Sequence, residues 1–428
     1  MRAALAVTVF AVAYLLIATE RINRVAVALG GAAAMVLIGA TDTHAAFFSE
    51  ETGVDWNVIF LLLGMMVIVS VVKQTGLFEF LAIWSAKKAR GRPFPIMVML
   101  VLLTAVASAF LDNVTTVLLV APVTLLVCER LDVPAAPYLI AEVLASNIGG
   151  AATLVGDPPN IIIASRAGLS FNDFLVNMGP IVVGLLVVFV LLCRVMFRRS
   201  FRYDEDRVAE MMALDEREVL GDVRQLIRAL VVLGAVVAAF VLHPVLHLEP
   251  SVIALLGAGT IVIVSRSSPA EFLEEVEWPT LVFFMGLFIM VGGLVETGVI
   301  RALGEAATAA VGDRYFVAAT GLLFGSAVLS GIVDNIPYVA TMTPLVQSLV
   351  DGADDPGQGR ALWWALALGA DLGGNATAIG ASANVVVLGI AARNGQPISF
   401  WQFTRYGLVV AAITVLLAWP YLWLRYYA

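Results

Sequence analysis

The stretch that decides the fold covers residues 146–160 and reads SNIGGAATLVGDPPN. Apolar sequence flanks it on both sides, so this polar stretch would lie at the depth of a membrane-spanning helix. The glycine pair Gly149-Gly150 allows a helix to unwind, and Pro158-Pro159 removes two backbone N–H donors. We therefore expect a broken helix whose freed backbone groups line a polar cavity rather than face lipid.

The whole chain has the composition of a polytopic membrane protein. Of its 428 residues, 61% are hydrophobic and 14% are charged, and the mean hydropathy is +0.94. Ordinary soluble domains carry about 45–50% apolar and about 25% charged residues. The net charge of −8 excludes the basic field that nucleic-acid binding needs. Cys128 and Cys193 lie far apart without metal-ligand spacing, so we predict no metal site and no cofactor.

Apolar segments long enough to cross a membrane recur along the chain, and the predicted fold is all-α. Uninterrupted candidates are 3–18, 25–40, 57–72, 174–197, 229–242, 252–265, 279–294 and 406–424. Four other apolar segments contain polar, glycine or proline interruptions. We expect re-entrant hairpins at 95–128 and 315–350, and broken helices at 137–164 and 361–392. Residues 77–89, with aromatic side chains ahead of a basic end, predict an interfacial helix.

The second half of the chain repeats the first. At one constant spacing along the chain, Val54-Asp55-Trp56 matches Val276-Glu277-Trp278, and Asp112-Asn113 matches Asp334-Asn335. At a slightly longer spacing, the glycine pair at 149–150 matches the one at 373–374. Matched interruptions in the two halves of a chain are the best sequence indication of a transporter's binding site.

We predict two transmembrane repeats, residues 1–197 and 229–428, joined by a linker at 198–228. Each repeat would contain about five transmembrane helices, a re-entrant hairpin and a broken helix. With the linker inside, 18 basic residues fall on the inner side and six on the outer side, which satisfies the positive-inside rule. The basic segment 87–92 has a weakly basic counterpart at 309–314, so the repeats are inverted. This predicts a multi-pass plasma-membrane protein with a cytoplasmic linker.

Four aspartates stand at the interruptions: Asp112, Asp157, Asp334 and Asp371. A carboxylate at the centre of a membrane helix costs roughly 2.5–3.5 kcal/mol, so the four represent on the order of 10 kcal/mol. One interpretation is that they cap the N-termini of half-helices. The other is that they carry protons or cations, because a buried carboxyl can exchange a proton as access alternates between the two sides.

Two motifs resemble those of the ion transporter superfamily: Leu-Asp-Asn-Val-Thr-Thr at 111–116, followed by Ala-Pro-Val-Thr, and the stretch 146–160. The most similar branch is the arsenite-permease and melanocyte P-protein-like one, near the NhaD-type sodium/proton antiporters. The resemblance covers nearly the whole chain. It implies inverted repeats and an elevator-like movement of a transport domain against a scaffold, usually in a homodimer. A soluble ATPase subunit is a further partner compatible with the resemblance.

The resemblance also implies that the substrate and the coupling ion bind to polar residues at both hairpin tips and both helix breaks. Carried over by motif position, these are Asp112, Asn113, Thr115, Asn147, Thr153, Asp157, Asn160, Asp334, Asn335, Asp371, Asn375, Thr377 and Asn384. The dicarboxylate branch has Ser-Asn-Thr at its tips, whereas both tips here begin with Asp. The added negative charge argues against a dianionic substrate.

The chain has no P-loop GK[ST] motif, so an ion gradient or a separate subunit must supply its energy. We predict proton-coupled efflux of a small inorganic solute, with arsenite or antimonite first. A sodium/proton antiporter is the alternative, because carboxylates and freed carbonyls suit a hard cation, and a chloride or carboxylate carrier is third. An intramembrane enzyme is not predicted, since no histidine lies in a predicted span. His243 and His247 flank a proline in a predicted outer loop, where no zinc site is expected.

Overall fold

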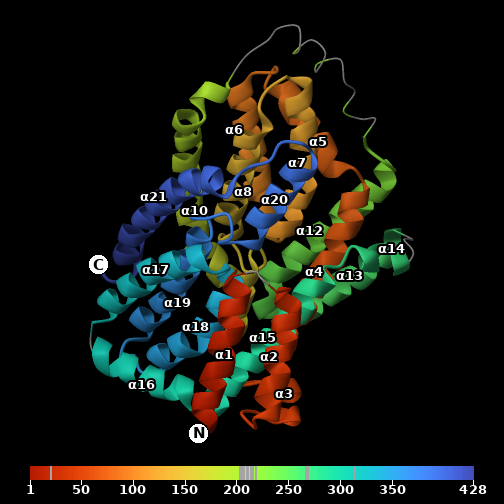
Figure 1. Ribbon diagram of the computed structural model, residues 1–428. Helices are drawn as coiled ribbons and strands as arrows, with labels where there is room; N and C mark the ends of the chain where they lie inside the picture. Colours follow the sequence, from red (N-terminus) through yellow and green to blue (C-terminus); the bar gives the residue numbers. More distant parts are fainter. Residues whose placement is uncertain are drawn as a thin grey trace.

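The structure is a computed structural model that describes residues 1–19, 22–201, 208, 212, 216, 219–265, 269–312 and 314–428. Throughout these residues the regular structure is helical, which confirms the all-α prediction (Figure 1). Most of the linker 198–228 lies outside the described residues. Its first part contains the short 3-10 helix η1 (Arg198–Ser200).

Uninterrupted helices form at all eight of the segments expected to cross directly. They are α1 (Arg2–Thr19), α2 (Arg24–Leu37), α4 (Trp56–Gln74), α10 (Phe171–Met196), α12 (Val223–Leu246), α13 (Pro250–Ser265), α15 (Trp278–Glu296) and α21 (Phe400–Tyr426). Counting the hairpin helices α7 (Asn113–Arg130) and α17 (Tyr315–Ile332), eight described helices are both apolar and long enough to span a membrane. The helices α2 and α13 are shorter than these eight.

All four interruptions occur where the sequence predicts them. The hairpins consist of α6 (Pro93–Ser108) with α7, and of α17 with α18 (Asn335–Asp351). The broken helices consist of α8 (Ala135–Gly150) with α9 (Pro158–Ala167), and of α19 (Pro356–Gly373) with α20 (Ser382–Arg393). Helix α9 begins at Pro158, where a proline is tolerated because backbone N–H groups in the first helical turn have no partner within the helix. The two-repeat fold class is therefore confirmed.

The long helices of one repeat pack against those of the other. Helix α4 packs on α13, and α15 packs on α2. A Cβ atom at Gly64 would lie 2.7 Å from the backbone of Ala254, and one at Gly286 would lie 2.8 Å from that of Ala28. The two contacts involve the same backbone atoms, so α4–α13 and α2–α15 are equivalent pairs in the same register. We call these four helices the framework.

The hairpins and broken helices also exchange partners between the repeats. Helix α7 packs against α20, and α9 packs against α18. Figure 1 shows α6, α7, α8 and α20 in the upper part of the molecule, and α17, α18 and α19 in the lower left part. The breaks of both repeats therefore meet near the middle of the molecule.

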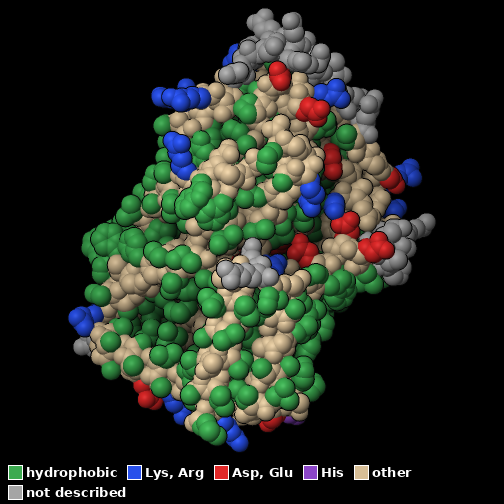
Figure 2. All heavy atoms as spheres, in the orientation of Figure 1, with side chains coloured by type: hydrophobic (Ala, Val, Ile, Leu, Met, Phe, Trp, Pro, Cys, Tyr) green, Lys and Arg blue, Asp and Glu red, His purple; other side chains and the backbone are tan. Residues whose placement is uncertain are grey.

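The surface is that of a membrane protein. Figure 2 shows hydrophobic side chains over most of the visible face, with Lys and Arg mainly in its upper half and near its lower end. Large apolar side chains such as Leu15, Val183 and Ile263 are exposed on α1, α10 and α13. The remaining short helices are α3 (Thr43–Phe48), α5 (Leu77–Lys88), α14 (Pro269–Glu274) and α16 (Val299–Val311). Helix α5 coincides with the segment predicted to form an interfacial helix.

Candidate functional site

Asparagine side chains from both repeats meet in the buried centre. The Nδ2 atom of Asn147, on α8, donates to Asn375 Oδ1 at 2.9 Å and to Asn384 Oδ1 at 3.1 Å. Its own Oδ1 accepts from Asn113 Nδ2, at the first hairpin tip, at 3.2 Å. All four side chains are buried. Asn147 therefore links the first hairpin and the first broken helix to the second broken helix.

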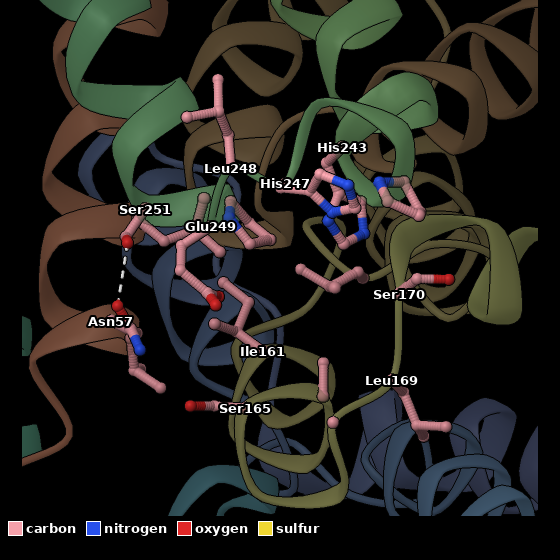
Figure 3. Close-up of a pocket in the computed structure, with 17 residues that line it drawn as sticks. Asn57, Ile161, Ser165, Leu169, Ser170, His243, His247, Leu248, Glu249 and Ser251 are labelled. Atoms are coloured by element: carbon pink, nitrogen blue, oxygen red, sulfur yellow. Dashed lines mark hydrogen bonds between the residues drawn. The ribbon is translucent and has the colours of Figure 1, made fainter. Parts of the chain in front are cut away.

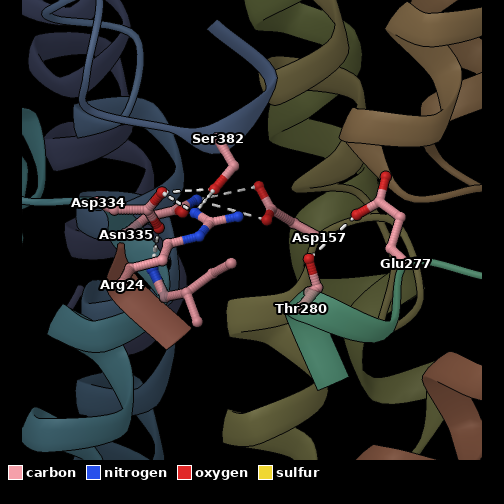
Figure 4. Close-up of polar contacts among 8 residues, drawn as sticks. Arg24, Asp157, Glu277, Thr280, Asp334, Asn335 and Ser382 are labelled. Carbon is pink, nitrogen blue, oxygen red and sulfur yellow. Dashed lines mark hydrogen bonds and ion pairs between the residues drawn. The ribbon is translucent and has the colours of Figure 1, made fainter. Parts of the chain in front are cut away.

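Asp157 joins the two hairpin tips. It lies in the break of the first broken helix and is fully buried. Its Oδ2 accepts from Asn113 Nδ2 at 3.1 Å. Both of its oxygens also accept from Asn335 Nδ2 at 3.4 Å (Figure 4). These partners are neutral amides, so the residues that hydrogen-bond to Asp157 provide no positive charge for its carboxylate.

Asp371 has a different environment, although it is also fully buried. It lies in the last turn of α19, just before the second break. Neither of its carboxylate oxygens makes a hydrogen bond of normal geometry within the described part of the chain, although the Asn160 side chain lies close to them. A buried carboxylate without a partner is costly unless it is protonated or binds a cation, so this side chain is suited to taking up one of the two.

The aspartates of the hairpin tips cap helices. Asp112 accepts from Thr115 N at 2.8 Å and from Thr115 Oγ1 at 2.5 Å, at the start of α7. Asp334 accepts from Ile336 N at 3.0 Å and from Ser382 Oγ at 2.6 Å. The capping interpretation therefore applies to these two aspartates. It does not apply to Asp157, which makes no side-chain cap to α9, or to Asp371, which lies inside a helix.

Several of the expected binding residues hold the broken segments in shape. Asn384 Nδ2 donates to the carbonyls of Gly374 and Thr377, both at 2.8 Å, and Asn160 does the same in the first repeat, to Gly150 and Thr153. The hydroxyls of Thr153 and Thr377 donate to carbonyls of the neighbouring hairpins. These contacts satisfy backbone groups that the breaks set free. One atom, Asn160 Oδ1, is buried without a partner among the described residues.

Sequence reasoning missed three charged residues near this centre. Arg24 Nη1, at the start of α2, donates to Ser382 Oγ at 2.9 Å and lies 3.7 Å from Asp334 Oδ2 (Figure 4). Glu277, at the start of α15, accepts from Thr280 Oγ1 at 3.1 Å. Glu142 is buried on α8, where it accepts from Thr124 Oγ1. Glu142 could have been found from sequence, because it is an acid in the otherwise apolar part of the segment 137–164 that precedes the break.

A separate cavity of about 570 Å³ lies beside α9, between α4 and the turn that joins α12 to α13 (Figure 3). His243, His247 and Glu249 line it on one side, and Leu154 and Ile161 on the other. His243 Nε2 accepts from the backbone N–H of Phe171 at 3.3 Å. Among the described residues, no group of three or more His, Cys, Asp or Glu side chains is placed to hold a metal.

Comparison with known proteins identifies the family. The model of the citrate transporter family, CitMHS, matches residues 14–369. The chain belongs to this family. It is 58% identical over 422 residues to an uncharacterized transporter of Mycobacterium tuberculosis, covering 99% of this chain and 98% of the relative. It is 56% identical over 422 residues to a 46 kDa membrane protein of Mycobacterium leprae, with the same coverage.

The chain also has more distant similarities. The P protein of Mus musculus is 32% identical over 495 aligned residues, which cover 97% of this chain and 59% of that protein. The crystal structure of the YdaH transporter of Alcanivorax borkumensis superposes with a TM-score of 0.62 at 14% identity, covering 91% of this chain and 87% of that one. The second comparison concerns the fold alone. Together these findings confirm the resemblance to the ion transporter superfamily, and this CitMHS-family chain is a membrane transporter.

Proposed function

We propose that this CitMHS-family protein is a proton-coupled secondary transporter that exports a small neutral solute, with arsenite or antimonite as the first candidate. The observation that supports coupling is the contrast between its two central carboxyls. Asp157 is held by two amides, whereas Asp371 is buried with no hydrogen-bond partner in the described chain. Asp371 is therefore our first choice for the proton carrier.

The polar groups of the centre favour a neutral hydroxylated solute. Amide groups of Asn113, Asn147, Asn335 and Asn375 can donate to and accept from hydroxyls. The four aspartates at the tips and breaks would repel a multiply charged anion, although the family model is named for citrate. Both cysteines are buried and unpaired at positions 128 and 193, away from the breaks, so thiolate coordination of arsenic is not part of this proposal.

For the mechanism, we propose alternating access by movement of the hairpins and broken helices as one unit against the framework. The two hairpins and both breaks are tied together by the network around Asn147 and Asp157. The framework helices, by contrast, pack on one another through close glycine–alanine contacts. This division supports a movable transport unit that contains the substrate and the proton.

Sodium/proton antiport is the second candidate. A hard cation takes oxygen ligands from carboxylates and carbonyls, and the two unpartnered oxygens of Asp371 favour this alternative. Several of the carbonyls that the breaks set free already accept from Asn160, Asn384 and their neighbours, which leaves fewer ligands for sodium. We therefore rank sodium second.

The test uses purified protein in proteoliposomes that contain a pH-sensitive dye. With an imposed proton gradient, arsenite, sodium, citrate and chloride are added separately. Our proposal expects a pH change with arsenite that Asp371→Asn abolishes while the variant still folds. A response to sodium and not to arsenite would move the chain to the cation antiporters. A response to citrate alone would refute a neutral substrate.

A further inference from the structure

We call the two hairpins and the two broken helices the movable elements. They contact the framework at two junctions that are related by the repeat but differ in structure. In the first junction, the start of α2 faces α20 and the tip of the second hairpin. In the second, the start of α13 faces α9 across a cavity. Ala28 and Ala254 occupy the same place in the α2–α15 and α4–α13 packing. In that register Arg24, the first residue of α2, corresponds to Pro250, the first residue of α13.

The first junction is closed by Arg24. Its Nη1 atom contacts Ser382, the first residue of α20, and Asp334, the cap of α18. Its guanidinium carbon also lies 5.5 Å from the centre of the Phe283 ring on α15. Asn335, next to Asp334, donates to Asp157 in the other repeat. One side chain thus connects two framework helices to the movable elements and, through them, to the central site.

The second junction is open beside Pro250, although the end of α9 is held near the start of α4. Ser165 Oγ donates to Asp55 Oδ2 at 2.6 Å, and Arg166 Nη1 donates to the carbonyls of Glu50 and Glu51 at 2.9 Å and 2.8 Å. Pro250 and its neighbours Glu249 and Ser251 line the cavity of about 570 Å³ (Figure 3). On the opposite wall are Leu154 and Ile161, which flank Pro158, the counterpart of Ser382. Leu61, the counterpart of Phe283, also lines the cavity. Pro250 and Leu61, the counterparts of Arg24 and Phe283, therefore border a cavity where the first junction has the Arg24 side chain.

The two junctions also differ in their charged residues. The ion pair between Arg24 and Asp334 is partly shielded, with side chains 38% and 17% exposed. Asp112, the counterpart of Asp334, has Thr115 as its side-chain partner and takes part in none of the ion pairs found among the described residues. A proline at position 250 cannot provide a matching cation or reach across the second junction.

We propose that Arg24 is a positioning residue that holds the movable elements against α2 and α15, and so keeps the cavity beside α13 open. Movement to the alternate state breaks the contacts of Arg24 with Asp334 and Ser382, and brings α9 towards α13 so that the cavity closes. The two hairpin-tip aspartates then differ in role, since Asp334 is bound to the framework and Asp112 is not. This inference rests on the alternating access proposed above.

The test measures access to the cavity in the full-length protein. Glu249, in the turn before α13, lines the cavity and is exposed. A Glu249→Cys variant in proteoliposomes is labelled with a membrane-impermeant maleimide, with and without Arg24→Gln. Loss of a partly exposed ion pair of this kind permits a population shift of about twofold to fivefold. We expect Arg24→Gln to slow labelling by that factor, and Arg24→Lys to restore most of the original rate.

Asp354→Cys, an exposed position in the turn between α18 and α19, is the matched control and should label at the same rate in both backgrounds. An unchanged or faster rate at Glu249→Cys in Arg24→Gln would overturn the proposal. If Arg24→Gln does not fold, Ser382→Ala removes the bridging hydroxyl and should slow labelling in the same direction. The labelling needs no transported solute, so its result is independent of the dye assay for transport.

Discussion

At the scale of single residues, four aspartates that look alike in the sequence have separate environments. Asp112 and Asp334 accept from backbone N–H groups at the start of helices α7 and α18. Asp157 accepts from two asparagine amides, and Asp371 from no described group. A carboxylate only accepts hydrogen bonds, whereas an asparagine side chain also has two N–H donors that need acceptors. The same substitution should therefore have different consequences at Asp157 and Asp371.

We predict that Asp157→Asn destabilises the protein by about 1–3 kcal/mol, because its new N–H group would face the donors Asn113 and Asn335. Asp371→Asn should leave stability unchanged or raised, because it removes a buried charge that has no partner in the described chain. Thermal unfolding of both variants in detergent, against the wild type, measures the difference. Equal losses at the two positions would contradict the environments described here.

Glu142 is another buried carboxyl side chain, and it has no counterpart among the four aspartates. Its Oε1 accepts from Thr124, and its Oε2 is buried without a partner in the described chain. The repeat offers no second acid to match it, since Leu366 stands at the equivalent position of the second broken helix. Glu142 is therefore a feature of the first repeat alone, outside the symmetric network around Asn147.

At the scale of elements, the framework depends on two glycines. Gly64 and Gly286 allow α4 and α15 to approach the backbones of α13 and α2, and a Cβ atom there would lie 2.7–2.8 Å from backbone atoms. Atoms at that distance must move apart, and the neighbouring backbone of a packed helix cannot yield as a flexible side chain would. The close packing of each helix pair therefore requires glycine at these two positions.

Gly64→Ala and Gly286→Ala should each destabilise the protein by about 1–3 kcal/mol, the usual cost of overpacking. Gly30→Ala on α2 is the control, because a Cβ atom there would have no neighbour within 4 Å. Alanine at position 30 should be neutral or slightly stabilising, since it favours helix more than glycine does. Midpoints of thermal unfolding for the three variants test this order.

At the scale of the whole molecule, the inverted repeat and the distribution of basic residues predict which loops face the cytoplasm. Ser200, after α10, should lie inside, and Asp354, between α18 and α19, should lie outside. An impermeant maleimide applied to intact cells should label Asp354→Cys, and label Ser200→Cys after the membrane is opened. The reverse pattern would refute the predicted orientation while leaving the fold intact.

Local sequence was enough to predict the helices and their interruptions, and it offered capping as one of two roles for the four aspartates. These features depend on local chemistry: apolar runs of membrane-spanning length, Gly149-Gly150 and Pro158-Pro159 at the first break, and Asp112 ahead of α7. The constant spacing between the matched Asp-Asn pairs was also sufficient to predict that both hairpins form. Each of these signals lies close in sequence to the structure it specifies, or recurs at the equivalent place in the other repeat.

Which polar residues contact one another, by contrast, depends on the packing of the two repeats in three dimensions. Asn147 meets Asn375, Asp157 meets Asn335, and Arg24 meets Asp334, although the members of each pair lie in different halves of the chain. Such contacts depend on how the two repeats pack, and both hairpin tips have the same Asp-Asn sequence. The physical reason is that hydrogen bonding and burial in the centre are set by neighbours in space, which a local pattern does not specify.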